Sequence, residues 1–207
     1  MEYLQTDVDP AGNPVKYDRS DAGIQAWMLF CVMVAGKGAA QTKAALTRFL
    51  SNAKTTPFAY ILELESKEPG TLLNAVMDAR AGQYSKLTKS FSVLAAYGTD
   101  WLRTCSVAEL ESVHGIGMKT SRFFVLSTRE NARHAALDTH LLKELRTEDA
   151  MPFLKAYNLH ETFIPTATPP KGLYLKLEQV VLDMADAKGM TPAAFDYEVW
   201  YKYYKGN

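Results

Sequence analysis

The residues of this chain best suited to chemistry are a lysine, an aspartate and two glycines. The glycines belong to the run Gly115-Ile116-Gly117, Lys119 follows closely, and Asp138 lies further along. Glycine has no Cβ, so a Gly-x-Gly turn lets backbone N–H groups approach a phosphate closely. An unprotonated lysine can attack an electrophilic carbon, and a carboxylate can stabilise the positive charge that develops there. The lysine and the aspartate are then expected within reach of the same substrate.

Helices must position these residues, because apolar side chains recur along the chain at three- and four-residue spacing. Sustained alternation with a period of two is hard to find, so we predict an all-α fold of short helices joined by turns that contain glycine or proline. The expected helices cover 21–35, 39–50, 57–64, 71–79, 84–97, 104–113, 118–128, 139–145, 151–157, 173–187 and a last one starting at Pro192.

Three helix starts carry local signals. Ser106 followed by Glu109 is typical of a capping box, and Pro192 suits the first position of a helix. Asp138 precedes a helix-like stretch and is a plausible N-cap for it. A cap and a catalytic carboxylate can be the same group, because capping aims the side chain while it satisfies free N–H groups.

Two helices joined by a tight Gly-x-Gly turn form a recurrent motif that binds the DNA backbone without sequence specificity. The turn amides donate to phosphate oxygens, and the second helix adds the positive end of its dipole. The residues predicted to bind the backbone are Gly115, Gly117, Thr120, Arg122 and His140. The alternative is an ordinary interhelical turn, since glycine commonly ends helices, with His140 facing solvent or bonded in the core.

The same segment resembles the helix-hairpin-helix DNA glycosylase superfamily of base-excision repair. The family pattern is Leu-Pro-Gly-Val/Ile-Gly-x-Lys-Thr/Val-Ala followed by Val-Asp-Thr/Val-His; here it reads Val113-His114-Gly115-Ile116-Gly117-Met118-Lys119-Thr120-Ser121 and Leu137-Asp138-Thr139-His140. His114 replaces the usual proline and Ser121 the usual alanine, and neither change removes a catalytic group. The length and the ending Phe-Asp-Tyr-x-x-Trp-Tyr are most similar to the compact 8-oxoguanine DNA glycosylases.

The resemblance implies a bifunctional DNA glycosylase and AP lyase that excises oxidised purine. Lys119 would attack C1′ of a flipped-out nucleotide and form a Schiff base, Asp138 would stabilise the cationic sugar, and β-elimination would nick the strand. The alternatives are a glycosylase for another damaged base, a non-catalytic DNA-binding module in which Lys119 only touches phosphate, and a protein-interaction domain with a coincidental turn.

The compact family also suggests where the base binds. Its last helix lies near the base pocket, which makes Phe195, Asp196 and Trp200 candidates, together with Gln25 on the first long helix. Core packing is the alternative for each of them. A loop before residue 84 offers Arg80, Gln83 and Tyr84 to fill the gap left by a flipped nucleotide, or it is a plain helix–helix connection.

The composition limits the other possibilities. The chain has 207 residues, 47% of them hydrophobic, and equal numbers of basic and acidic side chains, 23 each. It can bury a large core, and any DNA-binding surface must be a local patch. Cys31 and Cys105 lack metal-ligand spacing, so we expect reduced core thiols, no metal and no cofactor. The longest apolar run is too short for a bilayer. We expect an intracellular monomer that acts on damaged double-stranded DNA.

Two helical lobes are expected, with DNA bound in the cleft between them. Residues 36–113 would form a central lobe. Residues 1–35 and 114–207 would form a second lobe that carries the hairpin, the catalytic residues and the aromatic last helix.

Overall fold

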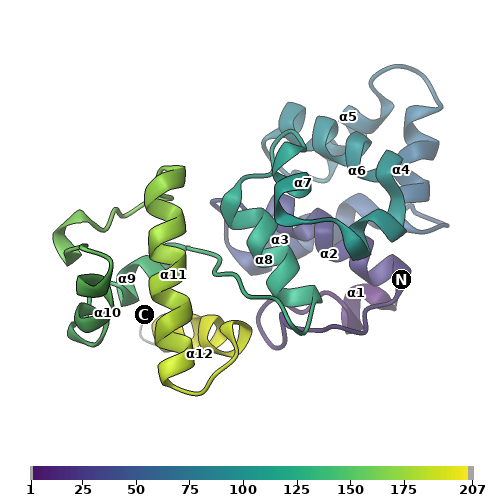
Figure 1. Cartoon of the computed structure of the whole chain (residues 1–207). Helices are drawn as coiled ribbons and strands as arrows, with labels where there is room; N and C mark the ends of the chain where they lie inside the picture. Colours follow the sequence, from purple (N-terminus) through teal and green to yellow (C-terminus); the bar gives the residue numbers. More distant parts are fainter. Residues whose placement is uncertain (1, 205–207) are drawn as a thin grey trace. The chain divides into compact units, whose positions relative to one another are not determined.

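The computed structural model describes residues 2–204, and every regular element within them is a helix (Figure 1). This confirms the all-α prediction. The α-helices are α1 Tyr3–Thr6, α2 Asp21–Met33, α3 Ala39–Leu50, α4 Pro57–Glu65, α5 Thr71–Asp78, α6 Tyr84–Thr104, α7 Val107–Ser112, α8 Met118–Thr128, α9 Thr139–Glu144, α10 Met151–Ala156, α11 Lys171–Ala187 and α12 Pro192–Tyr204. Two 3₁₀ turns, η1 Glu148–Ala150 and η2 Glu161–Phe163, flank α10.

The chain divides into two compact units, Met1–Phe124 and Val125–Asn207. Helix α8 begins in the first unit and ends in the second. The lobes predicted from the sequence have other bounds, 36–113 against 1–35 with 114–207, and they stay a prediction.

The first unit is built around α2. Every residue of this helix from Gly23 to Met33 is buried, as its nearly continuous apolar sequence predicts, and the helix packs against α1, α3, α4 and α6. Ser20 caps its start by accepting a hydrogen bond from the Gly23 amide at 3.1 Å. The adjacent helix α6 extends to Thr104 but is broken by a kink at Gly98, whose φ of 81° and ψ of −179° are not helical, so its first part ends near Tyr97, as predicted. The helix α1 was not predicted.

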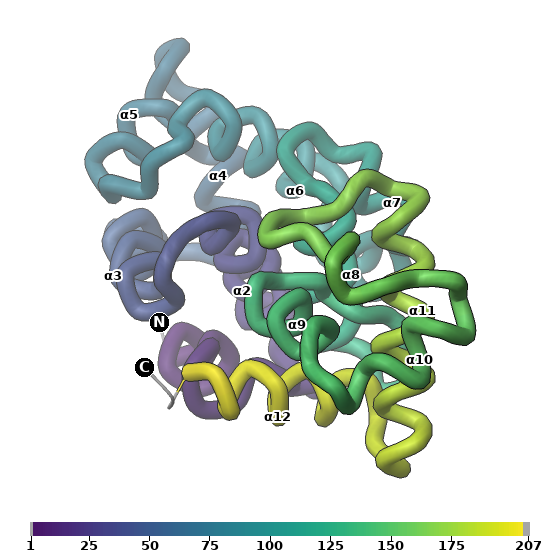
Figure 2. Tube along the Cα trace, turned by 90° about the vertical axis from the view of Figure 1, so that its left-hand side faces the viewer, coloured from purple at the N-terminus to yellow at the C-terminus, as the bar shows by residue number. Residues whose placement is uncertain are grey.

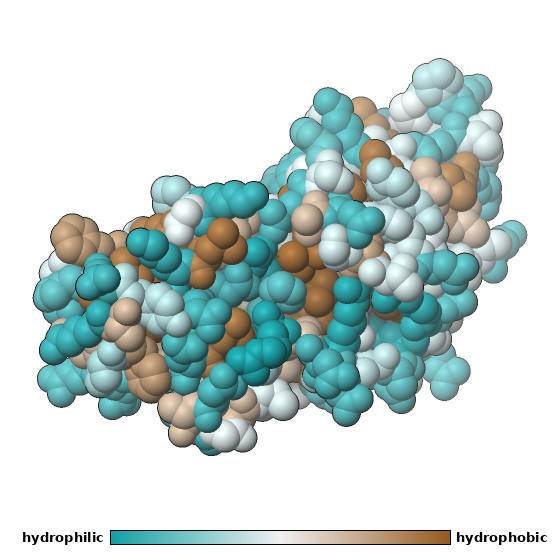
Figure 3. Space-filling view, in the orientation of Figure 1, coloured by the Kyte–Doolittle hydropathy of each residue, from teal (hydrophilic) through white to brown (hydrophobic). Residues whose placement is uncertain are grey.

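The second unit is built around α11, whose buried face includes Tyr174, Leu177, Val181 and Met184. Helices α10 and α12 pack on α11, and α12 also contacts α9 (Figure 2). Pro192 is the first residue of α12, as predicted. Figure 3 shows hydrophobic residues interspersed with hydrophilic ones on one face of this unit. Its exposed large hydrophobic side chains are Phe163, Leu175, Tyr201 and Tyr204.

Both cysteines, Cys31 and Cys105, are buried and free, which confirms that they are core thiols. Across residues 2–204, none of the helices is both long and apolar enough to cross a membrane. Within the same residues, no three His, Cys, Asp or Glu side chains are grouped as a metal site would require.

Candidate active site

The hairpin, residues 107–128, consists of α7, a tight turn and α8. Its first helix is capped as predicted: Ser106 Oγ accepts from the Glu109 amide at 3.2 Å, and the Glu109 carboxylate accepts from the Ser106 amide at 2.7 Å. The turn is closed by a hydrogen bond from the Ile116 amide to the Val113 carbonyl at 3.1 Å. The Ile116 side chain is buried and anchors the turn to the first unit.

The two turn glycines are required for different reasons. Gly115 has a φ of 85°, and a Cβ there would lie 2.6 Å from Ser90 Oγ and 2.8 Å from two carbons of Lys86. Ser90 Oγ also donates to the His114 carbonyl at 2.5 Å, which ties the turn to α6. A Cβ at Gly117 would meet no atom within 4 Å. Gly115 is therefore needed for packing, and Gly117 keeps an exposed backbone free of side-chain atoms.

The amides at the start of α8 point away from the helix. The Ser121 amide donates to the Gly117 carbonyl at 3.0 Å, so the amides of Gly117, Met118, Lys119 and Thr120 precede the first intrahelical bond. Within residues 2–204, no backbone carbonyl accepts from them. Free N–H groups and the positive dipole end make this turn suited to an anion.

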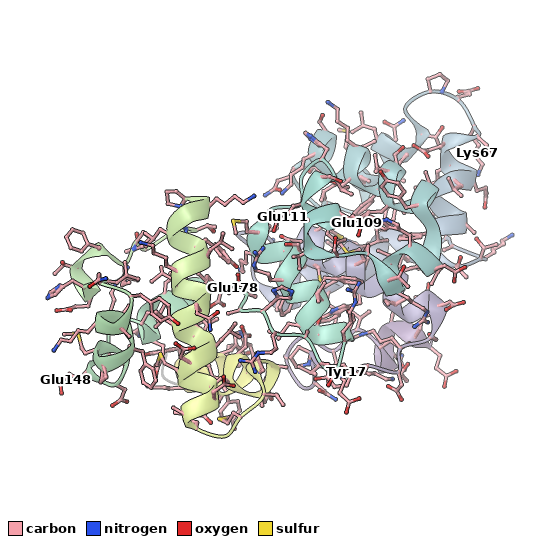
Figure 4. All side chains as sticks on the ribbon, in the orientation of Figure 1. Tyr17, Lys67, Glu109, Glu111, Glu148 and Glu178 are labelled. Atoms are coloured by element: carbon pink, nitrogen blue, oxygen red, sulfur yellow. The ribbon has the colours of Figure 1, made fainter. Side chains whose placement is uncertain are left out.

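A buried ion pair joins the two helices of the hairpin. Arg122 on α8 pairs with Glu111 on α7, and Ser121 Oγ also donates to this carboxylate at 3.2 Å (Figure 4). The Arg122 side chain is only 5% exposed. Arg122 was predicted to bind the DNA backbone, and its charge is already engaged inside the hairpin.

Lys119 lies in the first turn of α8 and is half-buried. Its positive charge and that of Arg19 act on the Cys31 thiol, whose pKa is nevertheless raised by burial. Arg19 is itself 2% exposed; it stacks over Trp27 at 4.3 Å, and burial lowers its pKa to about 10. The ring of Phe123 on α8 lies 5.6 Å from Trp27, which fixes α8 against α2.

Asp138 is the N-cap of α9, as predicted. Its Oδ1 accepts from the amides of His140 at 2.8 Å and Leu141 at 2.9 Å. Its Oδ2 accepts no hydrogen bond from the described residues. One carboxylate oxygen therefore fixes the side chain, and the other is available to a ligand.

His140 belongs to a cluster between α9 and α12. Its ring stacks on Tyr203 at 6.0 Å. The Tyr203 hydroxyl donates at 2.7 Å to Glu144, which also pairs with Lys202 at 2.8 Å. Burial, followed by the neighbouring Glu144 carboxylate, raises the pKa of Tyr203 to about 12. These contacts hold the imidazole beside the start of α9.

The predicted base-pocket residues are distributed over both units. Gln25 is buried in the first unit; its Nε2 donates to Thr99 Oγ1 at 2.6 Å and its Oε1 accepts from the Phe58 amide at 2.9 Å. Phe195 is fully buried in the second unit. Trp200 stacks on Tyr204 at 4.6 Å, and Asp196 is partly exposed on the same helix. The role in base recognition stays a prediction for all four predicted residues.

The predicted gap-filling loop joins α5 to α6. Arg80 and Gln83 have φ values of 54° and 49°, a left-handed backbone that is uncommon for residues other than glycine. Arg80, Gln83 and Tyr84 are exposed. Backbone strain of this kind is often found at functional sites, and the gap-filling role stays a prediction.

Two lysines flank this loop. Lys37 donates to the Ala81 carbonyl, and Lys86 donates to Gln83 Oε1 at 3.1 Å. Burial lowers the pKa of both, and the charge of Lys86 lowers that of Lys37 further. Neither forms an ion pair with an acidic side chain among residues 2–204. A cavity of about 220 Å³ lies between Lys37 and Arg80, bounded also by Met33 and Thr42.

A solved structure has the same fold. The crystal structure of Tm1821, the 8-oxoguanine DNA glycosylase of Thermotoga maritima, matches with a TM-score of 0.60 over 89% of this chain and 81% of that chain. The fold is that of a helical DNA glycosylase. The two sequences are 19% identical, so the likeness concerns the glycosylase fold alone. No protein-family model matches the chain, and no curated protein matches it in sequence.

Several residues that shape this site were not predicted. Glu111 was missed, although an acidic residue on one hairpin helix and Arg122 on the other are a recognisable pair. Lys37 lies between Gly36 and Gly38, a pattern that signals an exposed turn. Tyr174 and Glu178, discussed below, carry no such signal.

Proposed function

We propose that this protein is a DNA glycosylase and AP lyase that excises oxidised purine, 8-oxoguanine in particular, from duplex DNA. The main support for this proposal is the position of Lys119, which lies in the first turn of the helix that follows the Gly115-Ile116-Gly117 turn. Asp138, with one carboxylate oxygen open, and the glycosylase fold add support.

Each residue has a role in this proposal. Turn amides and the start of α8 would hold a phosphate, so that an adjacent nucleotide can leave the stack. The Lys119 amine would attack C1′, the C1′–N9 bond would break, and the purine would leave with the bonding electrons and take up a proton. Oδ2 of Asp138 would stabilise the positive charge on the sugar as that bond breaks. Ring opening would give the Schiff base, and loss of a C2′ proton would expel the 3′-phosphate.

Borohydride trapping tests the proposal directly, because it reduces the Schiff base to a stable adduct. The substrate is a duplex with a single 8-oxoguanine opposite cytosine. We expect an adduct from the unaltered protein and from Lys67→Gln, which changes an exposed lysine just after α4, and none from Lys119→Gln.

The remaining outcomes identify the alternatives. An adduct on an abasic-site duplex alone would keep the lyase and reject 8-oxoguanine as the substrate, and duplexes with other lesions would then be compared. No adduct on either duplex, with DNA still bound, would overturn the lysine mechanism and favour a binding module. No salt-sensitive DNA binding at all would favour a protein-interaction domain.

A further inference from the structure

Residues 133–137, part of the link between α8 and α9, have no regular structure, and the last three of them are buried. Ala135, Ala136 and Leu137 are each exposed by 2% or less. Buried backbone N–H and C=O groups need hydrogen-bond partners. A segment outside helices and strands cannot supply them itself, so another element must.

Helix α11 supplies them through one tyrosine. The Tyr174 hydroxyl donates to the Ala135 carbonyl at 2.9 Å and accepts from the Leu137 amide at 3.0 Å. Tyr174 is fully buried. A single hydroxyl thus fixes the backbone on both sides of Ala136.

Glu178, one turn further along α11, also bonds to this segment. Its Oε1 accepts from the Ala135 amide at 3.1 Å and lies 3.2 Å from His134 Nδ1 (Figure 4). Further along the same helix, Asp186 pairs with Arg133 at 2.7 Å. Positions 174 and 178 are four residues apart, so these two side chains share a face of the helix.

Leu137, whose amide donates to the Tyr174 hydroxyl, directly precedes Asp138 in the chain. On the other side of Asp138, its own Oδ1 is bonded to the first amides of α9. The backbone before the carboxylate and the side chain itself are therefore both held, and Oδ2 remains open.

We propose that Tyr174 and Glu178 are positioning residues, which set the place of the Asp138 carboxylate through the backbone of residues 133–137. This rests on the proposed function, in which Asp138 stabilises the sugar cation. A displacement of about 1 Å in a catalytic group can slow a reaction about 100-fold. Loss of this hydrogen bonding should therefore reduce the rate of base excision more than DNA affinity.

A double-mutant cycle separates positioning from general stability. Tyr174→Phe should slow single-turnover base excision about tenfold or more, with the Kd for DNA unchanged within about twofold. In an Asp138→Asn background, where Asn keeps the capping oxygen, the same change should have less than about a twofold effect. An equal loss in both backgrounds would overturn the proposal.

Matched variants control for the loss of a hydroxyl. Tyr157 also donates to α11, to Asp183 at 2.6 Å, and among the described residues its hydroxyl forms no hydrogen bond with residues 133–137; Tyr157→Phe should leave the rate unchanged. Glu178→Gln keeps an oxygen acceptor for the Ala135 amide and should retain most of the rate, whereas Glu178→Ala should lose it. An equal slowing by Tyr157→Phe would contradict positioning.

A measurement that does not depend on catalysis tests the positioning role separately from the proposed function. Hydrogen exchange by NMR should show faster exchange of the Leu137, His140 and Leu141 amides in Tyr174→Phe than in Tyr157→Phe. If the unaltered protein excises no base, the proposed function fails while this comparison still decides whether Tyr174 orders the cap. Unchanged exchange at these three amides would overturn the positioning role.

Discussion

Gly115 and Gly117 have the same residue type and different physical roles. At Gly115 the backbone has a positive φ and the space for a Cβ is filled by Ser90 and Lys86. At Gly117 the space is empty and the residue is exposed. The first glycine is required by the fold of the turn, whereas no atom of the described residues requires the second to lack a Cβ.

Alanine substitutions separate these roles. Gly115→Ala should lower the free energy of unfolding by about 1–3 kcal/mol, because alanine is strained at a left-handed position and clashes with Ser90. Gly117→Ala should change stability by less than about 1 kcal/mol but weaken DNA binding, since a methyl group would face the phosphate. Urea unfolding and DNA titration measure the two effects. Equal effects of both substitutions in both assays would contradict this division.

At the scale of elements, the hairpin depends on a buried charge pair between α7 and α8. The Arg122 guanidinium has lost most of its contact with water and pairs with Glu111. A buried charge whose partner is removed is costly, because the desolvation it suffered is no longer offset. The pair therefore sets how α8, and Lys119 with it, follows the turn.

Glu111→Gln tests this pair. It should lower the free energy of unfolding by about 1–3 kcal/mol, because the Arg122 charge loses its ionic partner. Glu63→Gln is the control: Glu63 pairs with Lys67, just beyond the end of α4, at 2.8 Å and at exposed positions, and such pairs contribute about 0–1 kcal/mol. Thermal or urea unfolding monitored by circular dichroism gives both values. A loss at Glu63 as large as that at Glu111 would refute the argument.

The helices that could be predicted are those with local signals. Ser106 with Glu109, Asp138 and Pro192 mark helix starts by side chains that satisfy or avoid backbone donors, and all three are confirmed. The end predicted near Tyr97 coincides with the kink at Gly98, whose φ of 81° and ψ of −179° are not helical, whereas the helical stretch beyond the kink, up to Thr104, was missed. Local signals predict starts better than lengths.

The candidate site was predictable only where it follows a continuous motif. Lys119 and the turn glycines are close in sequence, so spacing alone indicates that they act together. Tyr174 and Glu178 meet residues 133–137 only through the tertiary fold, and nothing in their own neighbourhood marks them. Gln25 shows the reverse case: a polar residue in an apolar helix suggests a ligand, yet both of its polar groups bond within the first unit.

At the scale of the whole molecule, the net charge is zero and cannot attract DNA in general. The proposed DNA binding must therefore depend on local charge. Lys37 and Lys86, beside the loop that precedes α6, are partly desolvated lysines without an acidic partner among the described residues. A phosphate would offset their mutual repulsion.

Salt dependence of DNA binding measures this contribution. Each phosphate contact adds about 0.9 to the slope of log K against log salt, so Lys37→Gln with Lys86→Gln should reduce the slope by about 1.8. Lys54→Gln with Lys67→Gln removes the same charge from exposed positions and should leave the slope unchanged. An identical reduction in both double variants would show that only net charge matters.

The burial of Cys31 has a consequence for redox chemistry. Thiolates react with peroxides and alkylating agents far faster than thiols do. Burial raises the pKa of Cys31 despite two nearby positive charges, so this side chain stays protonated and shielded while the protein is folded. A protein proposed to act on oxidised DNA thus keeps a sulfur atom within the electrostatic influence of Lys119 but shielded from the oxidants that damage DNA.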